Sequence, residues 1–302
     1  MKYLLNLFLL FAVFFTLNGQ EFDSFESKDG TKIFFQQFGD SGETIILLSG
    51  GPGLNPYYLE PLYNELKKKY KCILLHQRGT GNSILDKVDQ EFLTVQKYID
   101  DLNGLYKKLG NKKLILVGHS WGGMLSFSYA ANEPEKVKKV ILLNTGGVTD
   151  QFYTWFGSNI NMRLHKEDTD LYQEQIDNNR ETLIAIWPGY FFDRNIAIKT
   201  RHELDYKFRN QKGVNAFASG NWRERSEDRV AKLKKYKGAI DLITGRQDPV
   251  GESVVYEAKS IIPQLKYTFI EQCGHFPWIE GEKQAETFYK LFDESMSSIN
   301  YE

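Results

Sequence analysis

The sequence has little of several features that mark particular classes of protein. It contains only two cysteines in 302 residues, which is too few for a disulfide framework. Its formal net charge is −1, and its longest run of like charges is the lysine run at 67–69, so a basic surface for nucleic acid is not expected. It also has no internal repeat and no low-complexity segment. What is left is an ordinary globular composition, with 41% apolar and 25% charged residues.

Histidines and glycines do not form a known metal or cofactor pattern. The five histidines are dispersed along the chain, and they lack the spacing of metal ligands. The glycine-rich segments lack a strand followed by G-x-G-x-x-G, and they also lack G-x-x-x-x-G-K. The sequence therefore predicts neither a bound metal nor a cofactor.

One long apolar run stands at the beginning of the sequence. Lys2 precedes an almost unbroken apolar stretch at residues 3–17, which is followed by Asn18, Gly19 and Gln20. A membrane-spanning helix needs about 20 apolar residues, so this run is short for one. A basic start, a short apolar stretch and a small residue before a polar segment are typical of a secretory signal peptide. We therefore predict a signal peptide at 1–19 and export to the periplasm or the medium, without stable membrane association after cleavage. An uncleaved N-terminal anchor is the alternative.

Short apolar runs alternate with amphipathic segments through most of the remaining chain. Residues 22–26 and 33–38 are β-prone and flank Asp29-Gly30, a pair that favours a hairpin turn. Continuous apolar runs are typical of strands buried on both faces, and they occur at residues 44–48, 72–75, 114–117 and 140–143. Two further strands are predicted at residues 239–244 and 267–271. Helical patterns occur at residues 59–69, 98–109, 124–131, 252–261 and 284–296. The alternation predicts an α/β fold with a mostly parallel twisted sheet flanked by helices.

The alternation stops between residues 147 and 232. This stretch has a helical or irregular pattern and many scattered aromatic residues. We expect residues 147–232 to form an inserted, mainly helical cap (lid), with residues 20–146 and 233–302 as the core domain. The aromatic side chains are expected to form mainly the core of this cap, with a few of them also contacting a ligand.

The segment Gly118-His119-Ser120-Trp121-Gly122 lies between an apolar strand and a helical run. It matches G-x-S-x-G, a pattern too short to be informative by itself. Its strand–turn–helix setting, however, is the one that a nucleophile elbow requires, and the helix dipole favours a developing negative charge there. Ser120 is therefore predicted to be a catalytic nucleophile, with His119 pointing away from it. A tight glycine-rich turn without chemistry is the alternative.

A catalytic serine needs a base, and the base needs a carboxylate that orients it. Asp248 follows the predicted strand at 239–244, and His275 follows the predicted strand at 267–271. Both lie beyond the carboxyl ends of their strands, where α/β sheets gather their sites. The order serine, acid, histidine is the one that accompanies a nucleophile elbow. We therefore expect Asp248 and His275 to complete a triad with Ser120.

The reaction also needs an oxyanion hole. One donor is expected to be the backbone N–H of Trp121, the residue after the nucleophile. The second donor should come from the loop at residues 49–53, where consecutive glycines let the backbone approach a ligand closely. Gly51 is our candidate for this donor.

Several motifs occur through the core in a specific order. They are Gly50-Gly51-Pro52-Gly53, Gln77-Arg78-Gly79-Thr80-Gly81-Asn82-Ser83, Gly118-His119-Ser120-Trp121-Gly122-Gly123, Asp248-Pro249 and Gly274-His275. This combination resembles the prolyl iminopeptidase-like serine peptidases of the α/β-hydrolase superfamily. The resemblance implies the α/β-hydrolase fold. It also implies that Cys72 and Cys273 are free thiols, because their strands lie about five positions apart in that fold, at roughly 4.8 Å per strand.

Some positions depart from the family pattern. Ser49 stands where the family has His, and His76 stands where it has Asp. Family members hold the free α-amino group of the substrate with carboxylates, and Ala216 and Pro249 stand where two of these are expected. Losing the partner of a buried ammonium weakens binding strongly, so a requirement for a free amine does not follow from the resemblance.

Candidate substrate contacts in the cap are Glu203 and Glu224, which could replace the missing carboxylates, and the aromatic residues Trp222 and Phe217. The leading prediction is a serine hydrolase that releases a small N-terminal residue, such as proline, from short peptides. A carboxylesterase or lactonase acting on small molecules with the same triad is the alternative. A non-catalytic binding protein on a hydrolase scaffold is a further alternative, which the intact triad disfavours.

Overall fold

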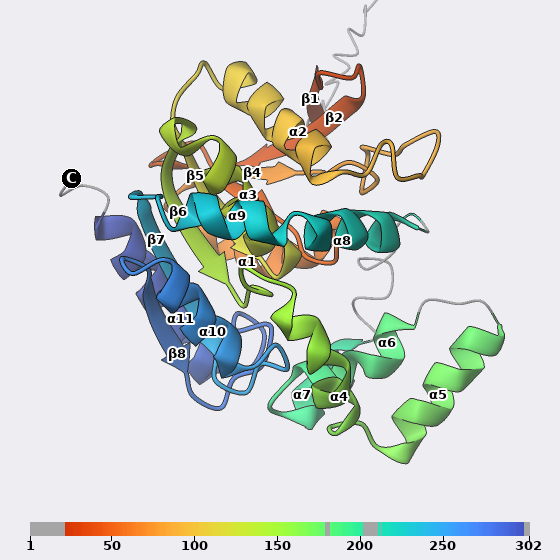
Figure 1. The fold of residues 1–302 in the computed structure, drawn as a ribbon. Coiled ribbons are helices and arrows are strands. Elements are labelled where there is room, and N and C mark those ends of the chain that lie inside the picture. Colours follow the sequence, from red (N-terminus) through yellow and green to blue (C-terminus); the bar gives the residue numbers. More distant parts are fainter. Residues whose placement is uncertain (1–21, 179–181, 202–210, 212, 299–302) are drawn as a thin grey trace, which may run out of the picture.

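A twisted sheet runs through the centre of the molecule, and helices lie on both of its faces (Figure 1). The computed structural model describes residues 22–178, 182–201, 211 and 213–298. The predicted signal peptide at 1–19 and the candidate residue Glu203 lie outside these residues.

In the described part of the chain, eight strands form one sheet in the order β1-β2-β4-β3-β5-β6-β7-β8. Their bounds are β1 (Phe22–Glu26), β2 (Lys32–Phe38), β3 (Thr44–Leu48), β4 (Lys71–Leu75), β5 (Leu114–His119), β6 (Val137–Leu143), β7 (Ala239–Gly245) and β8 (Lys266–Ile270). The pairings of β1 with β2 and of β2 with β4 are antiparallel, and the others are parallel. The predicted α/β fold with a mostly parallel sheet is confirmed.

The central strands are apolar throughout because both of their faces are covered. On β3, Ile46 and Leu48 belong to the hydrophobic cluster on one face of the sheet, while Ile45 and Leu47 belong to the cluster on the other face. All four side chains are fully buried. Side chains alternate between the two faces of a strand, so a strand between two helical layers needs an apolar residue at every position.

The two helical layers can be assigned from the clusters in which their side chains lie. The layer of α2 (Val95–Lys108), α3 (Trp121–Asn132) and α10 (Glu252–Ile261) covers one face. The layer of α1 (Glu60–Leu66) and α11 (Glu282–Ser297) covers the other. The helix predicted at 59–69 is shorter than expected, because the backbone N–H groups at 67–70 close turns that lead directly into β4.

The segment between β6 and β7 divides into two parts by its packing. Its helices are α4 (Phe156–Asn161), α5 (Lys166–Asp177), α6 (Leu183–Ile186), α7 (Arg194–Arg201), α8 (Val214–Glu224) and α9 (Ser226–Leu233). The first four lie together beyond one end of the sheet, whereas α8 and α9 run along the core and pack on α2 and α3 (Figure 1). The cap boundary at 147–232 stays a prediction.

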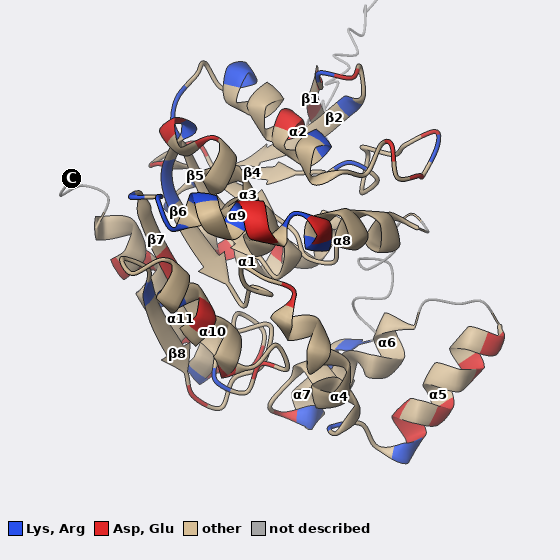
Figure 2. Ribbon diagram, viewed as in Figure 1, with Lys and Arg blue, Asp and Glu red and all other residues tan. Residues whose placement is uncertain are grey.

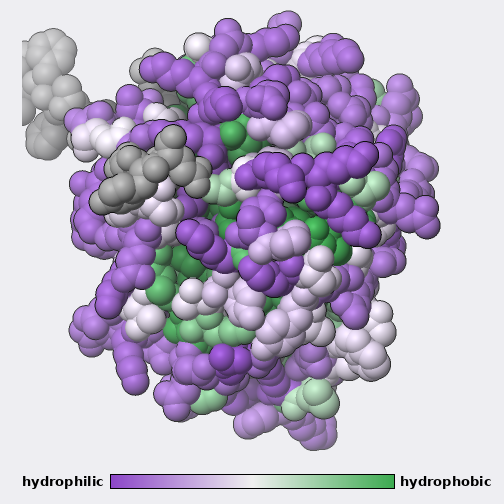
Figure 3. Space-filling view, turned by 60° about the vertical axis from the view of Figure 1, so that its left-hand side comes forward, coloured by the Kyte–Doolittle hydropathy of each residue, from purple (hydrophilic) through white to green (hydrophobic). Residues whose placement is uncertain are grey.

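Charged residues of both signs are spread over most elements, and α5 carries mainly acidic ones (Figure 2). On the face drawn in Figure 3, hydrophobic residues gather in the hollowed central part, with hydrophilic residues around it. Among the described residues, no helix has both the length and the apolar character needed to cross a membrane.

The two cysteines lie far apart in the sheet. Cys72 lies on β4 and Cys273 follows β8, and these strands are separated by five positions in the strand order. Both thiols are free and buried, and burial raises the pKa of Cys72 to about 12. The prediction of two free thiols is confirmed.

Candidate active site

Ser120 lies at a sharp turn between β5 and α3. Its backbone has φ 53° and ψ −116°, and its N–H donates to the carbonyl of Leu143 at 2.9 Å. A Cβ on Gly118 would overlap the carbonyl oxygen of Gly122, and a Cβ on Gly122 would overlap that of Leu48. Gly118 is therefore required by close packing within the turn, and Gly122 by close packing of the turn against β3. The turn has the strand–turn–helix geometry of a nucleophile elbow.

His275 and Asp248 come together on the loops after β8 and β7. His275 Nδ1 lies 2.9 Å from Asp248 Oδ2 and 3.0 Å from Oδ1. Both residues are buried. A carboxylate can only accept in such a bond, so Nδ1 carries the proton and Nε2 is left as the basic nitrogen. The structure thus joins the two residues in the way that a serine–histidine–acid triad uses.

Asn144 also belongs to this constellation, and the sequence analysis missed it. It follows the last residue of β6, has φ 48°, and donates from Nδ2 to Asp248 Oδ2 at 2.7 Å and to the carbonyl of Gly274 at 2.9 Å. The Asp248 carboxylate receives a third bond from the N–H of Val250 at 2.9 Å. Asn144 therefore ties the acid to the loop that carries His275. Its place at the carboxyl end of a parallel strand was the available signal.

Glu280 is a second residue that the sequence analysis missed. This buried carboxylate accepts the N–H of Gly274 at 2.9 Å on one oxygen, and those of Phe192 and Asp193 at 2.8 Å on the other. Burial raises the pKa of Glu280 to about 7. The side chain thus joins the His275 loop to the segment that precedes α7.

The glycine loop after β3 lies against the elbow. A Cβ on Gly50 would come within 3.1 Å of Ser120 Cβ, which shows how closely the two backbones approach. The N–H of Gly50 donates to the Tyr58 hydroxyl at 2.6 Å and so is already engaged. The backbone N–H groups of Gly51 and Trp121 donate to no residue in the described part of the chain. These are the two groups predicted to form the oxyanion hole.

Gln77, the first residue of its motif, bonds to both the glycine loop and the start of α3. Gln77 Nε2 donates to the carbonyl of Ser49 at 2.8 Å, and Gln77 Oε1 accepts the indole N–H of Trp121 at 3.1 Å. One side chain therefore connects the glycine loop with the first residue of α3. The adjacent Arg78 is fully buried and forms a two-point ion pair with Asp101, with N–O distances of 2.7 and 2.5 Å.

The two departures Ser49 and His76 lie on this floor of the site. Ser49 Oγ accepts a second bond from Gln77 at 3.0 Å. His76 Nδ1 accepts the N–H of Asn82 at 2.9 Å, and burial lowers the pKa of His76 to about 4. Both side chains therefore hold loops next to the site rather than reach toward Ser120.

Two aromatic rings from the segment between β6 and β7 lie close to His275. The ring of Tyr190 lies 5.4 Å from it and that of Phe156 lies 6.5 Å from it, centroid to centroid. The carbonyl of Tyr190 accepts the N–H of His275 at 2.8 Å. Within the described residues, the Ser120 hydroxyl forms no hydrogen bond, and its side chain is partly exposed. Residues of the segment between β6 and β7 thus cover the imidazole of His275, while the Ser120 side chain stays partly exposed.

The candidate substrate residues of the cap have different environments. Trp222 is fully buried in the core, with the Arg229 guanidinium 3.6 Å above its ring, so the structure gives it a packing role instead of a substrate contact. Phe217 is half-buried against the same core. Glu224 is exposed and accepts a weak bond from Asn221 at 3.4 Å.

Ala216 lies in the first turn of α8, and its neighbours contact the glycine loop. Its neighbour Asn215 donates from Nδ2 to the carbonyl of Pro52 in the glycine loop at 3.3 Å. Val214 packs so closely on Gly53 that a Cβ added to Gly53 would lie 3.0 Å from Val214 Cγ1. The first turn of α8 therefore rests on the glycine loop, and the exposed Ala216 stands beside it without a charge.

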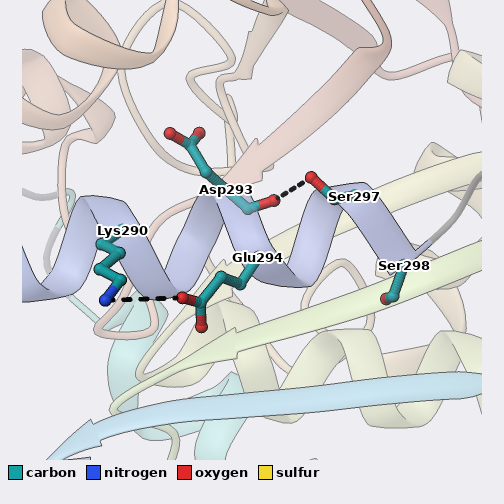
Figure 4. Close-up of a pocket in the computed structure, with 5 residues that line it drawn as sticks. All are labelled: Lys290, Asp293, Glu294, Ser297 and Ser298. Carbon is teal, nitrogen blue, oxygen red and sulfur yellow. Dashed lines mark hydrogen bonds and ion pairs between the residues drawn. The ribbon is translucent and has the colours of Figure 1, made fainter.

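A separate hollow on α11 is lined by Lys290, Asp293, Glu294, Ser297 and Ser298 (Figure 4). Lys290 pairs with Glu294 at 3.9 Å, and Ser297 Oγ donates to the carbonyl of Asp293 at 2.8 Å. These bonds lie within one helix, and the lining contains none of the predicted catalytic residues, so we do not assign a site there.

The fold and the elbow define a class of protein, and sequence comparison identifies the same class. The pattern of the alpha/beta hydrolase fold family matches residues 43–282. The chain therefore belongs to this family and is a hydrolase.

Two relatives show which members of the family this chain is similar to. The chain is 26% identical to a proline iminopeptidase of Lactobacillus delbrueckii subsp. bulgaricus over 251 residues, which cover 78% of this chain and 84% of the relative. It is 38% identical to a cis-3-alkyl-4-alkyloxetan-2-one decarboxylase of Shewanella oneidensis, but over only 125 residues, 40% of this chain and 38% of that protein. The predicted resemblance to proline iminopeptidases is confirmed.

Solved structures share the fold. A proline iminopeptidase-related protein from Thermus thermophilus has a TM-score of 0.70 and 20% identity, covering 92% of this chain and 98% of that protein. A thermophilic esterase from Thermogutta terrifontis has a TM-score of 0.66 and 21% identity, covering 92% of this chain and 99% of that chain. The same scaffold is therefore found in proteins named for different substrates.

Proposed function

We propose that this chain is an exported serine hydrolase in which Ser120, His275 and Asp248 form a catalytic triad. The bond of His275 Nδ1 to the Asp248 carboxylate, on loops beside the Ser120 elbow, is the observation that carries the proposal. Proton removal by the imidazole is what makes a serine hydroxyl nucleophilic, and the carboxylate supports the imidazolium that forms.

In this mechanism, Ser120 Oγ attacks the carbonyl carbon of the substrate while His275 Nε2 takes the hydroxyl proton. The N–H groups of Gly51 and Trp121 bind the oxyanion of the tetrahedral intermediate. His275 then protonates the leaving group as the bond to it breaks, leaving an acyl-enzyme. Water, deprotonated by His275, attacks the acyl-enzyme, and Ser120 recovers its proton as the acid product leaves.

We further propose that the substrate is a short peptide with a small N-terminal residue, such as proline. The support is the similarity to a proline iminopeptidase over most of both chains. A second candidate, an uncharged ester or lactone, is favoured by the uncharged, exposed Ala216, which lies in the helix turn that contacts the glycine loop through Asn215. A site for a substrate ammonium would need a carboxylate there or nearby.

The catalytic proposal is tested by labelling with a fluorophosphonate, which forms an adduct with an activated serine. The wild-type protein should be labelled at Ser120, and Ser120→Ala should be neither labelled nor active. Ser126→Ala is a matched control, because Ser126 lies on α3, the helix that follows Ser120, but is buried and donates to the carbonyl of Gly122. An unlabelled wild-type protein, or an active Ser120→Ala variant, would refute the triad.

The two substrate classes are separated by proline-naphthylamide, its N-acetylated form and a short-chain nitrophenyl ester. A peptidase should cleave the first and not the second, whereas an esterase should cleave the ester quickly and ignore the free amine. Ala216→Glu should raise the preference for the free amine, and Ala216→Gln is the neutral control of equal size. Equal preference in both variants would show that position 216 does not contact the amino group.

Export is tested by following the full chain and a variant without residues 2–19 in a bacterial host. The full chain should reach the periplasm or the medium in a shortened form, and the truncated variant should stay in the cytoplasm. Recovery of the full-length chain in the membrane fraction would support the uncleaved anchor instead.

A further inference from the structure

His119, the residue before the proposed nucleophile, is a buried histidine to which the mechanism assigns no role. Its side chain lies beneath the site, with its ring 4.7 Å from that of His275 and 4.9 Å from that of Trp278. As expected, its ring nitrogens bond to residues other than Ser120. Nε2 lies 2.9 Å from the carbonyl oxygen of His275, and Nδ1 lies 2.7 Å from the hydroxyl of Tyr58.

The direction of each bond around His119 follows from the chemistry of the groups. A carbonyl oxygen can only accept, so His119 Nε2 carries the proton and donates to His275. Nδ1 of the neutral ring is then an acceptor, and the Tyr58 hydroxyl donates to it. The Tyr58 oxygen in turn accepts the N–H of Gly50 at 2.6 Å. The result is one directed chain from Gly50 through Tyr58 and His119 to the backbone of His275.

This chain connects two loops that the reaction must keep in register. Gly50 begins the glycine loop whose next residue, Gly51, is the proposed oxyanion donor, and His275 is the proposed base. Burial lowers the pKa of His119 well below its usual range, and the nearby His275 adds to this effect. Burial likewise raises the pKa of Tyr58. Both links therefore keep their proton pattern while His275 gains and loses a proton during turnover.

Packing alone does not explain these two polar side chains. Burying a polar group costs free energy unless it is hydrogen-bonded, and apolar rings of similar size would fill the same space. A second catalytic base is also not a suitable explanation, because both nitrogens of His119 are engaged in bonds. What the polar pair adds is a fixed distance between the glycine loop and the His275 loop.

We propose that Tyr58 and His119 are positioning residues that hold the oxyanion loop and the catalytic histidine in register. This inference rests on the proposed function, since it concerns the geometry of the same triad. A misplacement of about 1 Å costs roughly 100-fold in rate, so loosening either loop should be visible in turnover.

The test uses Tyr58→Phe, His119→Phe, His119→Gln and the double variant Tyr58→Phe/His119→Phe. Two readouts are measured: the second-order rate of Ser120 labelling by a fluorophosphonate, and kcat and KM for a short-chain nitrophenyl ester. We expect labelling and kcat to fall about 10- to 100-fold in Tyr58→Phe and His119→Phe, with KM within about twofold of wild type. His119→Gln keeps an N–H that can reach the His275 carbonyl, so it should recover part of the loss.

The double variant tests whether the two residues act as one chain. If they do, it should be about as slow as His119→Phe alone, because the connection is already broken. Tyr129→Phe is the matched control: its hydroxyl, on the buried α3, donates to Asn103 at 3.1 Å, and its loss should leave labelling unchanged. Thermal unfolding of each variant shows which ones fold, and Tyr58→Phe and His119→Gln carry the test if His119→Phe does not.

Wild-type labelling in folded Tyr58→Phe, or losses that multiply in the double variant, would overturn the inference. A loss of labelling no larger than that of Tyr129→Phe would overturn it as well. These outcomes differ from a failure of the proposed function, which would appear as an unlabelled wild-type protein or as activity that persists in Ser120→Ala.

Discussion

The strongest single test of the site outside the triad is Asn144→Ala. The change removes two buried hydrogen bonds, one to the Asp248 carboxylate at 2.7 Å and one to the carbonyl of Gly274 at 2.9 Å. A bond to a charged group contributes about 1.5–3 kcal/mol and a neutral one about 0.5–1.5 kcal/mol. Asn144 Oδ1 is buried without a partner in the described structure, so removing it returns part of this loss. We expect the free energy of unfolding to fall by about 2–3 kcal/mol.

The catalytic effect of the same change follows from how Asp248 is held. The carboxylate keeps its bonds to His275 and to the N–H of Val250, so the proposed triad should survive but be less constrained. About 1.4 kcal/mol of lost transition-state stabilisation corresponds to a tenfold fall in kcat/KM, which is the size we expect. Asn103→Ala is the control, because the Asn103 side chain is also held by hydrogen bonds away from the site, to Glu133, Tyr129 and Lys136. Equal kinetic losses in the two variants, or none in Asn144→Ala, would refute the reasoning.

Asn144→Asp sharpens this test by keeping the size of the side chain. It places a second carboxyl within hydrogen-bond distance of Asp248, and two carboxylates this close do not both ionise readily. At low pH the pair shares a proton and should imitate the native bond. As the pH rises the shared proton is lost, and the repulsion between the two carboxylates should separate the pair. Plots of kcat/KM against pH should therefore diverge from wild type on the alkaline side, and parallel curves over the whole range would contradict the assigned bond.

Three further substitutions, at Glu280, Arg78 and Gly122, test residues that hold the loops and the turn of the site in place. Burial raises the pKa of Glu280 from 4.5 to about 7. The protonated carboxyl therefore gives its full stabilisation below pH 4.5, and up to about 3 kcal/mol of the free energy of unfolding is lost as the pH rises to 7. In Glu280→Gln, the free energy of unfolding measured with urea should change less between pH 4.5 and 7 than in the wild type. The same pH dependence in both proteins would contradict this role of Glu280. Arg78→Leu leaves the buried Asp101 unpaired and should cost about 3–5 kcal/mol, which Arg78→Leu/Asp101→Leu should partly restore. Gly122→Ala forces a Cβ onto the carbonyl of Leu48, so it should cost about 1–3 kcal/mol and slow Ser120 labelling, unlike an alanine at the open position Gly157.

The parts of the site that could be predicted are those that depend on one strand and the turn after it. Ser120 was recognisable because the glycines of its turn are required by local packing, and these glycines leave a pattern in the sequence. Asp248 and His275 were recognisable because each directly follows a buried strand, and the carboxyl ends of parallel strands meet at one edge of the sheet.

The parts that could not be predicted depend on a partner far away in the chain. Asn144 also follows a strand, but its role appears only when the loops of Asp248 and Gly274 reach it. Trp222 looked like one aromatic residue of the cap among many, yet α8 packs on the core and buries it there. An apolar or aromatic residue shows that a helix face will be buried, but it does not show which surface will cover that face.

The parallel order of the strands explains why some site residues could be predicted from the sequence and others could not. The strands β3, β5, β6, β7 and β8 are parallel neighbours, so the residues after them, from Gly50 to His275, collect at a single edge. Chemistry-bearing residues can be read from such positions one at a time. Turnover depends in addition on the spacing between these loops, and that spacing is set by cross-links such as Gln77, Asn144 and the Tyr58–His119 pair. Variants of the cross-links should therefore reduce turnover without abolishing it, whereas loss of Ser120 or His275 should abolish it.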